Sequence, residues 1–179
     1  MQHLGLLSVV LLAIGLTVTA VTLPGGLQKT FSQRVANNKQ AELYYALLFI
    51  VVLPLLYIFF LLWFVPVIGI HHSFLWFAVV AIVFQIACTL VPERGGMHTI
   101  IHRMLTGISG VALLPLVVLI ATTQSTPIFL QQVVWAVFAL MIALLTVALL
   151  NQKGFKYALL LQIGYYALFF CAVLLVTYT

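Results

Sequence analysis

The chain has 179 residues, of which 65% are hydrophobic and only 5% are charged. A soluble domain has about a quarter of its residues charged, so this chain has too few charged side chains to cover a surface that faces water. Its net charge of +5 comes from seven Lys and Arg residues against two Glu, and the seven cations are scattered in or next to three short loops. Because they form no continuous phosphate-binding stripe, the composition argues against a nucleic-acid partner.

The first apolar run covers residues 4–23 and ends at Pro24. It is long enough to cross the hydrocarbon core of a bilayer, which is about 30 Å thick. The three residues before residue 4 contain no Lys or Arg, and no convincing cleavage site follows. The run is therefore predicted to be a retained helix and not a secretory signal peptide.

The next segment, residues 24–42, is the longest polar stretch and contains Lys29, Arg34 and Lys39. It is predicted to be a solvated connector. Phe31 and Val35 lie four positions apart within it, which is also the spacing of one face of a helix. The alternatives are a short helix at the membrane interface or an extension of the helix that follows.

Residues 43–92 contain only one polar interruption. As one straight helix they would extend about 75 Å at 1.5 Å per residue, so the chain is predicted to fold back once. The break is placed at Pro66, Gly69 and residues 71–73, where Pro, Gly and two His interrupt the apolar pattern. This placement predicts one helix over residues 43–65 and another over residues 74–91.

Three more apolar runs predict helices over residues 97–122, 128–150 and 157–178. The predicted fold is therefore all-α, a single transmembrane domain of six helices over residues 1–179.

Six of the seven Lys and Arg residues fall in alternate loops, at residues 24–42, 92–97 and 151–156, and the seventh, Arg103, follows the second of these loops near the start of the next predicted helix. Cytoplasmic loops of membrane proteins carry an excess of Lys and Arg. We therefore expect a multi-pass protein of a bacterial cytoplasmic membrane, with these three loops in the cytoplasm and both termini outside.

Polar residues inside the apolar runs are the natural candidates for a function, because unsatisfied polar groups are costly in a bilayer. Gln85 and Gln162 are predicted to lie at mid-membrane, with hydroxyls from Thr89, Ser109 and Thr146. They either form hydrogen bonds between helices or line a cavity that lipids can reach. No charged residue lies in the middle of a predicted helix, which argues against a voltage sensor or a carboxylate proton relay.

Small residues and prolines occur inside two of the predicted helices. Gly107 and Gly110 are expected to let a neighbouring helix approach closely. Pro54 and Pro115 are expected to kink their helices, and kinks can open a cavity.

His98 and His102 are one helical turn apart and could present two metal ligands, with Glu93 as a third. A zinc site usually needs three or four protein ligands, and this chain has no Asp and only two Glu. A haem between His71 or His72 and this pair is excluded by the predicted topology, which puts the two groups at opposite membrane faces. No cofactor is predicted. Cys88 and Cys171 lie in apolar runs and are expected to be core residues.

The group formed by Glu93, Arg94, His98, His102 and Arg103 is the one place where several ionisable side chains converge in the sequence. Its two Arg residues are candidates for binding anionic headgroups, together with the Gln residues at 85 and 162. The alternative is a purely structural turn between the third and fourth helices.

Residues 89–102, Thr-Leu-Val-Pro-Glu-Arg-Gly-Gly-Met-His-Thr-Ile-Ile-His, resemble a pattern in a family of small six-helix prokaryotic membrane proteins, domain-of-unknown-function family 998. In that family, Pro plus an acidic residue ends the third helix and a His opens the fourth. Here Pro92, Glu93 and His98 would take these places, with Glu where Asp is frequent. The resemblance implies the six-helix fold and leaves the activity open.

The function expected from the sequence is a membrane protein without an evident catalytic site. It either binds lipid or is a small subunit of a membrane complex, with membrane lipids, other membrane subunits or further copies of itself as partners. One alternative is a lipid hydrolase of the inner leaflet with His98, His102 and Glu93 at its centre. A second is a small-molecule transporter, although no inverted repeat is visible.

Overall fold

A computed structural model describes residues 1–150 and 156–179, and the secondary structure of these residues consists of helices joined by turns and loops, without strands. Six helices are long and apolar enough to span a membrane, which confirms the predicted fold class. These are α1 (Gln2–Thr22), α3 (Lys39–Phe59) with its continuation to Ile68, α5 (Ser73–Leu90), α6 (Gly96–Ala121), α7 (Ile128–Leu150) and α8 (Ala158–Tyr178).

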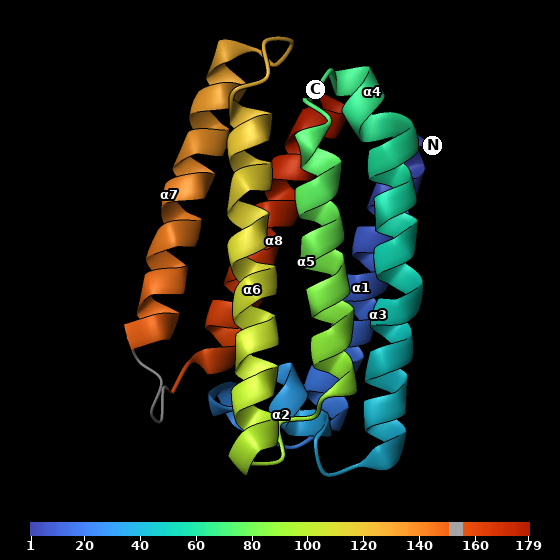
Figure 1. Cartoon of the computed structure of the whole chain (residues 1–179), viewed down its shortest axis with the longest axis vertical. Helices are drawn as coiled ribbons and strands as arrows, with labels where there is room; N and C mark the ends of the chain where they lie inside the picture. The colour runs from blue at the N-terminus through green and yellow to red at the C-terminus, as the bar shows by residue number, and fades with distance from the viewer. Residues whose placement is uncertain (151–155) are drawn as a thin grey trace.

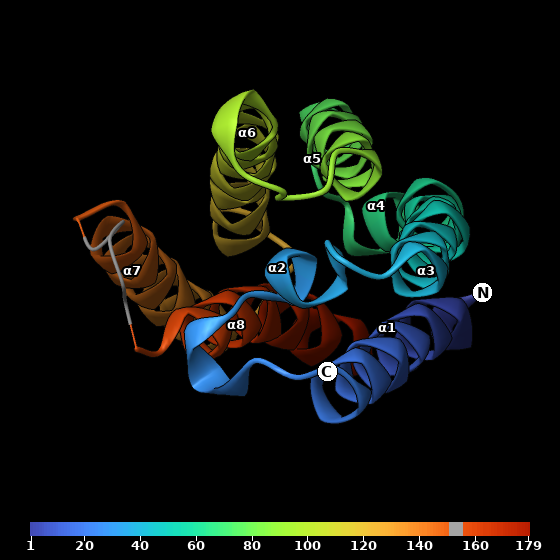
Figure 2. The same cartoon turned by 90° about the horizontal axis from the view of Figure 1, so that it is seen from below.

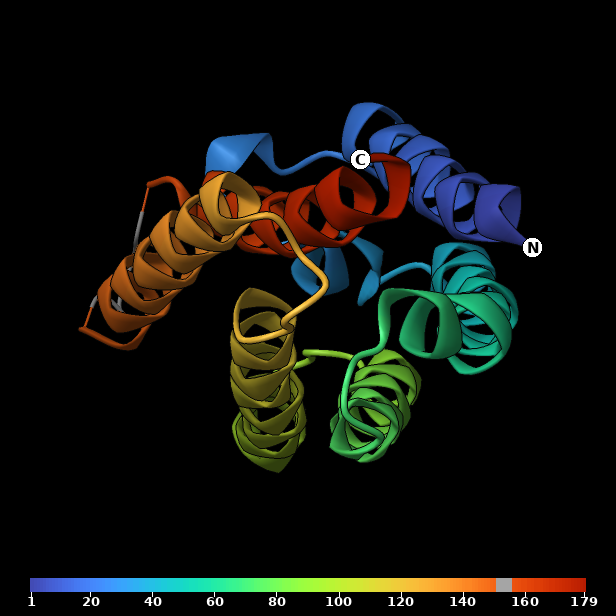
Figure 3. The same ribbon diagram turned by 90° about the horizontal axis from the view of Figure 1, so that it is seen from above.

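The spanning helices are arranged as an incomplete ring with one helix outside it (Figures 2 and 3). Going round, α1 packs on α3, α3 on α5, α5 on α6 and α6 on α8, and α8 returns to α1. Helix α7 packs on α6 and α8 at the periphery. At the end that carries the termini, α1 and α8 are joined by a hydrogen bond from the Gln2 side chain to the carbonyl oxygen of Thr177, at 2.9 Å.

Both termini lie at one end of the bundle, and the α5–α6 loop and the segment between α1 and α3 lie at the other (Figure 1). The second end therefore carries Lys29, Arg34, Arg94 and Lys156, as the alternation of charge predicted, and we call it the basic end. Of the last basic loop, residues 151–155 lie outside the described residues.

Helix α3 begins at Lys39, four residues before the predicted start at residue 43. The reason is a cap: the Asn38 side chain accepts hydrogen bonds from the backbone N–H groups of Gln40 and Ala41. Helices need such acceptors for their first N–H groups, and the apolar pattern does not reveal them.

The same helix also runs past the predicted end at residue 65. A wide π turn at Phe60–Phe64 precedes α4 (Val65–Ile68), and the chain turns only at Gly69, which has φ +76°. In a regular helix the ring of Pro66 would clash with the carbonyl of Leu62, and the wider turn accommodates it. Pro54 and Pro115, by contrast, lie within α3 and α6 without ending either helix.

The prediction of a solvated connector over residues 24–42 is wrong for the central part of this segment. Residues Phe31–Val35 form a short helix, α2, that lies inside the ring at the basic end (Figure 2). Phe31 and Val35 are buried in the core and do not lie on the membrane surface. The helix begins with a capping box, in which Thr30 and Gln33 each bond the other's backbone N–H. Helix α2 therefore closes one end of the ring.

Close helix approach occurs in α1 and not at the predicted glycines. A Cβ placed on Gly5 would lie 2.7 Å from the Phe59 ring, and one on Gly15 would lie 2.5 Å from Leu48. Nothing lies within 4 Å of a Cβ on Gly107, and the nearest atom to one on Gly110 is 3.9 Å away. Gly5 and Gly15 therefore allow α1 and α3 to approach closely, whereas Gly107 and Gly110 of α6 have no such tight contact.

We expect Gly5→Ala to lower the free energy of unfolding in detergent by about 1–3 kcal/mol, because Phe59 is fully buried and its ring cannot move away. Gly107→Ala is the matched control in another helix and should be neutral or stabilising, since Ala favours helix more than Gly. Denaturant titration of both variants measures the difference. Equal effects would show that α1 does not pack against the Phe59 ring.

The positive-inside rule predicts that the basic end faces the cytoplasm. Single-cysteine variants at two exposed loop residues test this, Asn37→Cys at the basic end and Gln124→Cys at the opposite end. A membrane-impermeant maleimide added to intact cells should label Gln124→Cys at once and Asn37→Cys only after permeabilisation. The reverse pattern would invert the orientation, and equal labelling of both would contradict the topology.

Candidate functional site

Two hollows lie between the helices. The larger, which we call the central cavity, has a volume of about 1250 Å³. Its walls come from α1, α3, α5, α6 and α8, with Phe60 towards the end that carries the termini and Phe31 and Arg34 of α2 at the basic end. Ala13 of α1 and Ala167 of α8 line it and are exposed, so the cavity opens sideways between these two helices.

Three polar residues meet deep in the wall of the central cavity, Ser109, Tyr166 and, between them, Gln85. The Gln85 side-chain oxygen accepts a hydrogen bond from the hydroxyl of Tyr166 at 2.7 Å. Ser109 donates to the same oxygen at 3.2 Å and to the carbonyl of Ala81 at 2.9 Å. Within the described part of the chain, the amide nitrogen of Gln85 has no partner, although the residue is only 5% exposed. Two N–H donors therefore remain unused beside an apolar space.

Arg34 is the charged residue in the wall of the central cavity, and it is only 8% exposed. Its guanidinium donates to the carbonyl oxygens of Ala20 (2.9 Å), Leu23 (2.8 Å), Lys29 (3.3 Å) and Gly26. The described ion pairs join other residues, so no carboxylate neutralises this cation within that part of the chain. The backbone carbonyls around Arg34 accept hydrogen bonds from its guanidinium but carry no formal negative charge.

The smaller hollow, which we call the inner pocket, has a volume of about 480 Å³ and lies at the basic end between α2, α6, α7 and α8. It brings together four residues that the sequence singled out: Glu93, His102, Arg103 and Gln162. Tyr166 lines both hollows and separates them. The inner pocket is more polar than the central cavity, since hydroxyls of Thr30 and Ser32 also line it.

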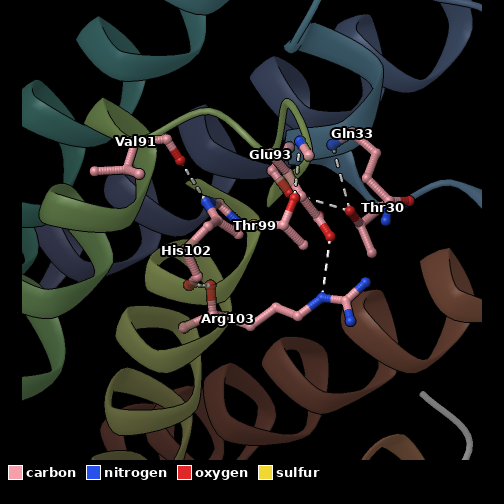
Figure 4. A network of polar contacts seen from close by, with 10 residues as sticks. Thr30, Gln33, Val91, Glu93, Thr99, His102 and Arg103 are labelled. Atoms are coloured by element: carbon pink, nitrogen blue, oxygen red, sulfur yellow. Dashed lines mark hydrogen bonds and ion pairs between the residues drawn. The ribbon is translucent and has the colours of Figure 1, made fainter. Parts of the chain in front are cut away.

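Glu93 links α2 to α6 across the inner pocket (Figure 4). Its carboxylate accepts from Arg103 Nε at 3.1 Å and from the Ser32 hydroxyl at 3.4 Å. The Glu93 side chain is 7% exposed, whereas that of Arg103 is 53% exposed. The carboxylate is thus nearly buried and its cation is only partly withdrawn from the surroundings, so Coulomb attraction alone is a modest source of stability here.

His102 is buried and its ring is fixed by a hydrogen bond between Nδ1 and the carbonyl oxygen of Val91, at 2.7 Å (Figure 4). A carbonyl only accepts, so Nδ1 carries a proton and donates it, and Nε2 has no hydrogen-bond partner among the described residues. His98, one turn earlier, is exposed and lines neither hollow. In the described part of the chain, no three His, Cys, Asp or Glu side chains come together as a metal site would require.

Arg94 points away from the inner pocket. It forms a two-pronged ion pair with Glu42 of α3, and its Nε also donates to the carbonyl of Ala36 at 3.1 Å. The hydrogen bond to Glu42 raises the pKa of Arg94 above its usual value. Arg94 therefore connects the α5–α6 loop to the start of α3. This contact corresponds to the alternative of a purely structural turn between the third and fourth spanning helices.

Gln162 lies near the basic end, one helical turn after the start of α8, and not at mid-membrane as predicted. Gln85 is also nearer the basic end than predicted, five residues before the end of α5. The Gln162 side-chain oxygen accepts from the backbone N–H of Phe31 at 3.2 Å. That N–H belongs to the first turn of α2, where it has no partner within its own helix. Sequence reasoning could not foresee this contact, because it depends on α2 entering the bundle.

Four polar residues of the two hollows were missed as site candidates by the sequence analysis: Ser32, Arg34, Tyr165 and Tyr166. Tyr165 donates to the carbonyl of Gly110 at 2.6 Å, and its Cε1 is the nearest atom to a Cβ placed on that glycine, at 3.9 Å. A pair of tyrosines in the middle of an apolar run was a signal, since buried tyrosine hydroxyls need partners.

Comparison with known proteins adds no match: no family model, no curated protein and no solved structure is similar enough to this chain to be reported. The resemblance to domain-of-unknown-function family 998 therefore stays a prediction.

We expect Glu93→Gln to lower the free energy of unfolding by about 1–2 kcal/mol, since hydrogen bonds to a charged partner contribute about 1.5–3 kcal/mol and exposed Arg103 reduces that value. Amide hydrogen exchange across residues 30–36 should accelerate, because α2 loses a link to α6. Glu42→Gln is the matched control for the more exposed pair with Arg94 and should leave α2 protected. Unchanged exchange in Glu93→Gln would contradict the linking role.

Proposed function

We propose that this membrane protein binds lipid in the central cavity. The observation that carries the proposal is the cavity itself, about 1250 Å³ in volume and walled by apolar side chains. Pockets for small molecules usually have volumes of about 300–1,000 Å³, so this one is large for a compact metabolite. Its opening lies between two apolar helices, and in a membrane that opening faces acyl chains.

The positive-inside rule supports placing the basic end, and with it α2, in the cytoplasmic leaflet of a bacterial membrane. Helix α2 restricts passage through that end of the ring, and the cluster of Phe59, Phe60, Phe64 and Phe74 fills the opposite end with rings 5.1 to 5.6 Å apart. A lateral entrance with both ends filled suits lipid binding better than transport across the membrane.

The lipid hydrolase considered from the sequence receives less support. Nε2 of His102 has no hydrogen-bond partner in the described part of the chain, and a general base would need such a ring nitrogen. A nucleophile would have to contact it, and the Ser32 hydroxyl instead contacts Glu93 and Thr30. We therefore favour binding over catalysis for this site. Assembly with other membrane subunits is compatible with lipid binding and is not needed for it.

The test places a large side chain at the cavity mouth. Ala167→Trp puts an indole where the lipid would lie, without displacing a packed neighbour, because Ala167 is exposed. Native mass spectrometry after gentle detergent extraction should show roughly tenfold less bound lipid than in wild type, equivalent to about 1.4 kcal/mol of lost affinity.

Ala139→Trp is the matched control, since Ala139 is exposed on α7 and lines neither hollow. It should retain lipid as wild type does. Equal lipid retention by both Trp variants, or the absence of bound lipid from wild type, would overturn the proposal. A stoichiometric protein partner recovered without lipid would favour the role of a complex subunit.

A further inference from the structure

We propose that the lipid in the central cavity is an anionic glycerophospholipid from the leaflet at the basic end, with its phosphate beside Arg34 and an acyl ester carbonyl hydrogen-bonded to Gln85. This inference rests on the proposed function and adds the class of lipid and the residues that select it. It is carried by two observations on the same cavity wall, an unneutralised cation and an unused pair of amide donors.

The charge argument concerns Arg34. Four of the five N–H groups of its guanidinium have carbonyl partners, which leaves one Nη2 hydrogen without a partner among the described residues. The carbonyls of Ala20 and Leu23 belong to the C-terminal end of α1, whose dipole supplies about half a negative charge. A net positive charge therefore remains on Arg34, whose exposed fraction is only 8%. A buried charge is stable when it is paired, and a phosphate would complete the pair.

The depth argument concerns Gln85. It lies five residues before the last residue of α5, which corresponds to about 7.5 Å along the helix axis from the basic end. In a glycerophospholipid the ester carbonyls lie deeper in the membrane than the phosphate. A lipid with its phosphate at Arg34 would thus place a carbonyl oxygen where the amide of Gln85 has two N–H donors and no partner in the described residues.

The remaining wall accounts for the acyl chains. Tyr178 and Thr179 line the cavity where α8 ends. Elsewhere beyond Gln85, towards the end that carries the termini, the lining is apolar and includes Leu12, Leu56, Ala78, Leu116 and Phe169. No titratable side chain on these positions would oppose a hydrocarbon chain. The order along the cavity, cation, amide donor and then hydrocarbon wall, follows the order of groups in the proposed lipid.

The experiment uses the full chain in detergent with defined lipids and native mass spectrometry. Equimolar phosphatidylglycerol and phosphatidylcholine with the same acyl chains measure the preference for an anion. An ether-linked phosphatidylglycerol, which lacks the ester carbonyls, measures the contribution of the amide. Wild type should prefer phosphatidylglycerol over phosphatidylcholine by roughly tenfold or more, and the ester over the ether lipid by roughly three- to tenfold.

Two variants assign these preferences to residues. Arg34→Gln should bind phosphatidylglycerol and phosphatidylcholine equally, whereas Lys29→Gln, which removes an exposed cation from the same end, should keep the preference. Gln85→Leu should keep the preference for the anion and lose the discrimination between ester and ether lipids.

The outcomes separate this inference from the proposed function. Bound lipid without a charge preference in wild type, or a preference that survives Arg34→Gln, overturns the anionic class and leaves lipid binding intact. Absence of any bound lipid overturns both. If Arg34→Gln does not fold, the ester-against-ether comparison in wild type and Gln85→Leu decides, and equal binding of the two lipids by wild type overturns the inference.

Discussion

A hydrocarbon environment offers no hydrogen bonds, and this constraint explains why α2 is held inside the bundle by polar contacts from several helices. Gln162 of α8 accepts from its first backbone N–H, and Glu93 of the α5–α6 loop accepts from Ser32. Arg34 of α2 in turn donates to carbonyls at the end of α1. Each contact satisfies a group that would otherwise be costly to bury, so the position of α2 is specified more sharply than apolar packing alone would achieve. Both hollows owe their closed basic end to this helix.

The two hollows meet at Tyr166, and the polar groups around it form the boundary between an apolar and a polar compartment. On one side Gln85 and Arg34 line an otherwise hydrocarbon-like cavity. On the other, Glu93, His102 and Arg103 line the inner pocket, where the charges are paired and the histidine is fixed by a backbone carbonyl. The Glu93–Arg103 charges of the inner pocket are paired, whereas Arg34 has no carboxylate partner in the described residues. The central cavity is therefore a better candidate for binding an anion than the cluster that the sequence pattern favours.

The sequence predicted the number of helices, their approximate bounds and the segregation of the basic loops, because hydropathy and charge bias act locally and can be read one segment at a time. It also identified Gln85 as an exceptional polar residue. It placed α2 outside the core and Gln162 too deep, and it expected close packing at Gly107 instead of Gly5. The errors on α2 and on the glycines share a cause: each depends on which segments far apart in the chain come together, and periodicity within one segment carries no such information. The depth of Gln162 is a different case, because residue 162 already lies near the start of the helix predicted over residues 157–178.

The contacts of Arg34 also bear on how the protein is assembled in the membrane. The carbonyl oxygens of Ala20 and Leu23 lie at the end of a helix and receive their hydrogen bonds from a residue 14 and 11 positions later in the chain. Until that later segment has been synthesised and folded, the end of α1 must be solvated by water or by headgroups. The first spanning helix and the short helix after it therefore reach their final positions together during insertion. A chain interrupted between them would leave the carbonyl groups at the end of α1 without their hydrogen-bond donor.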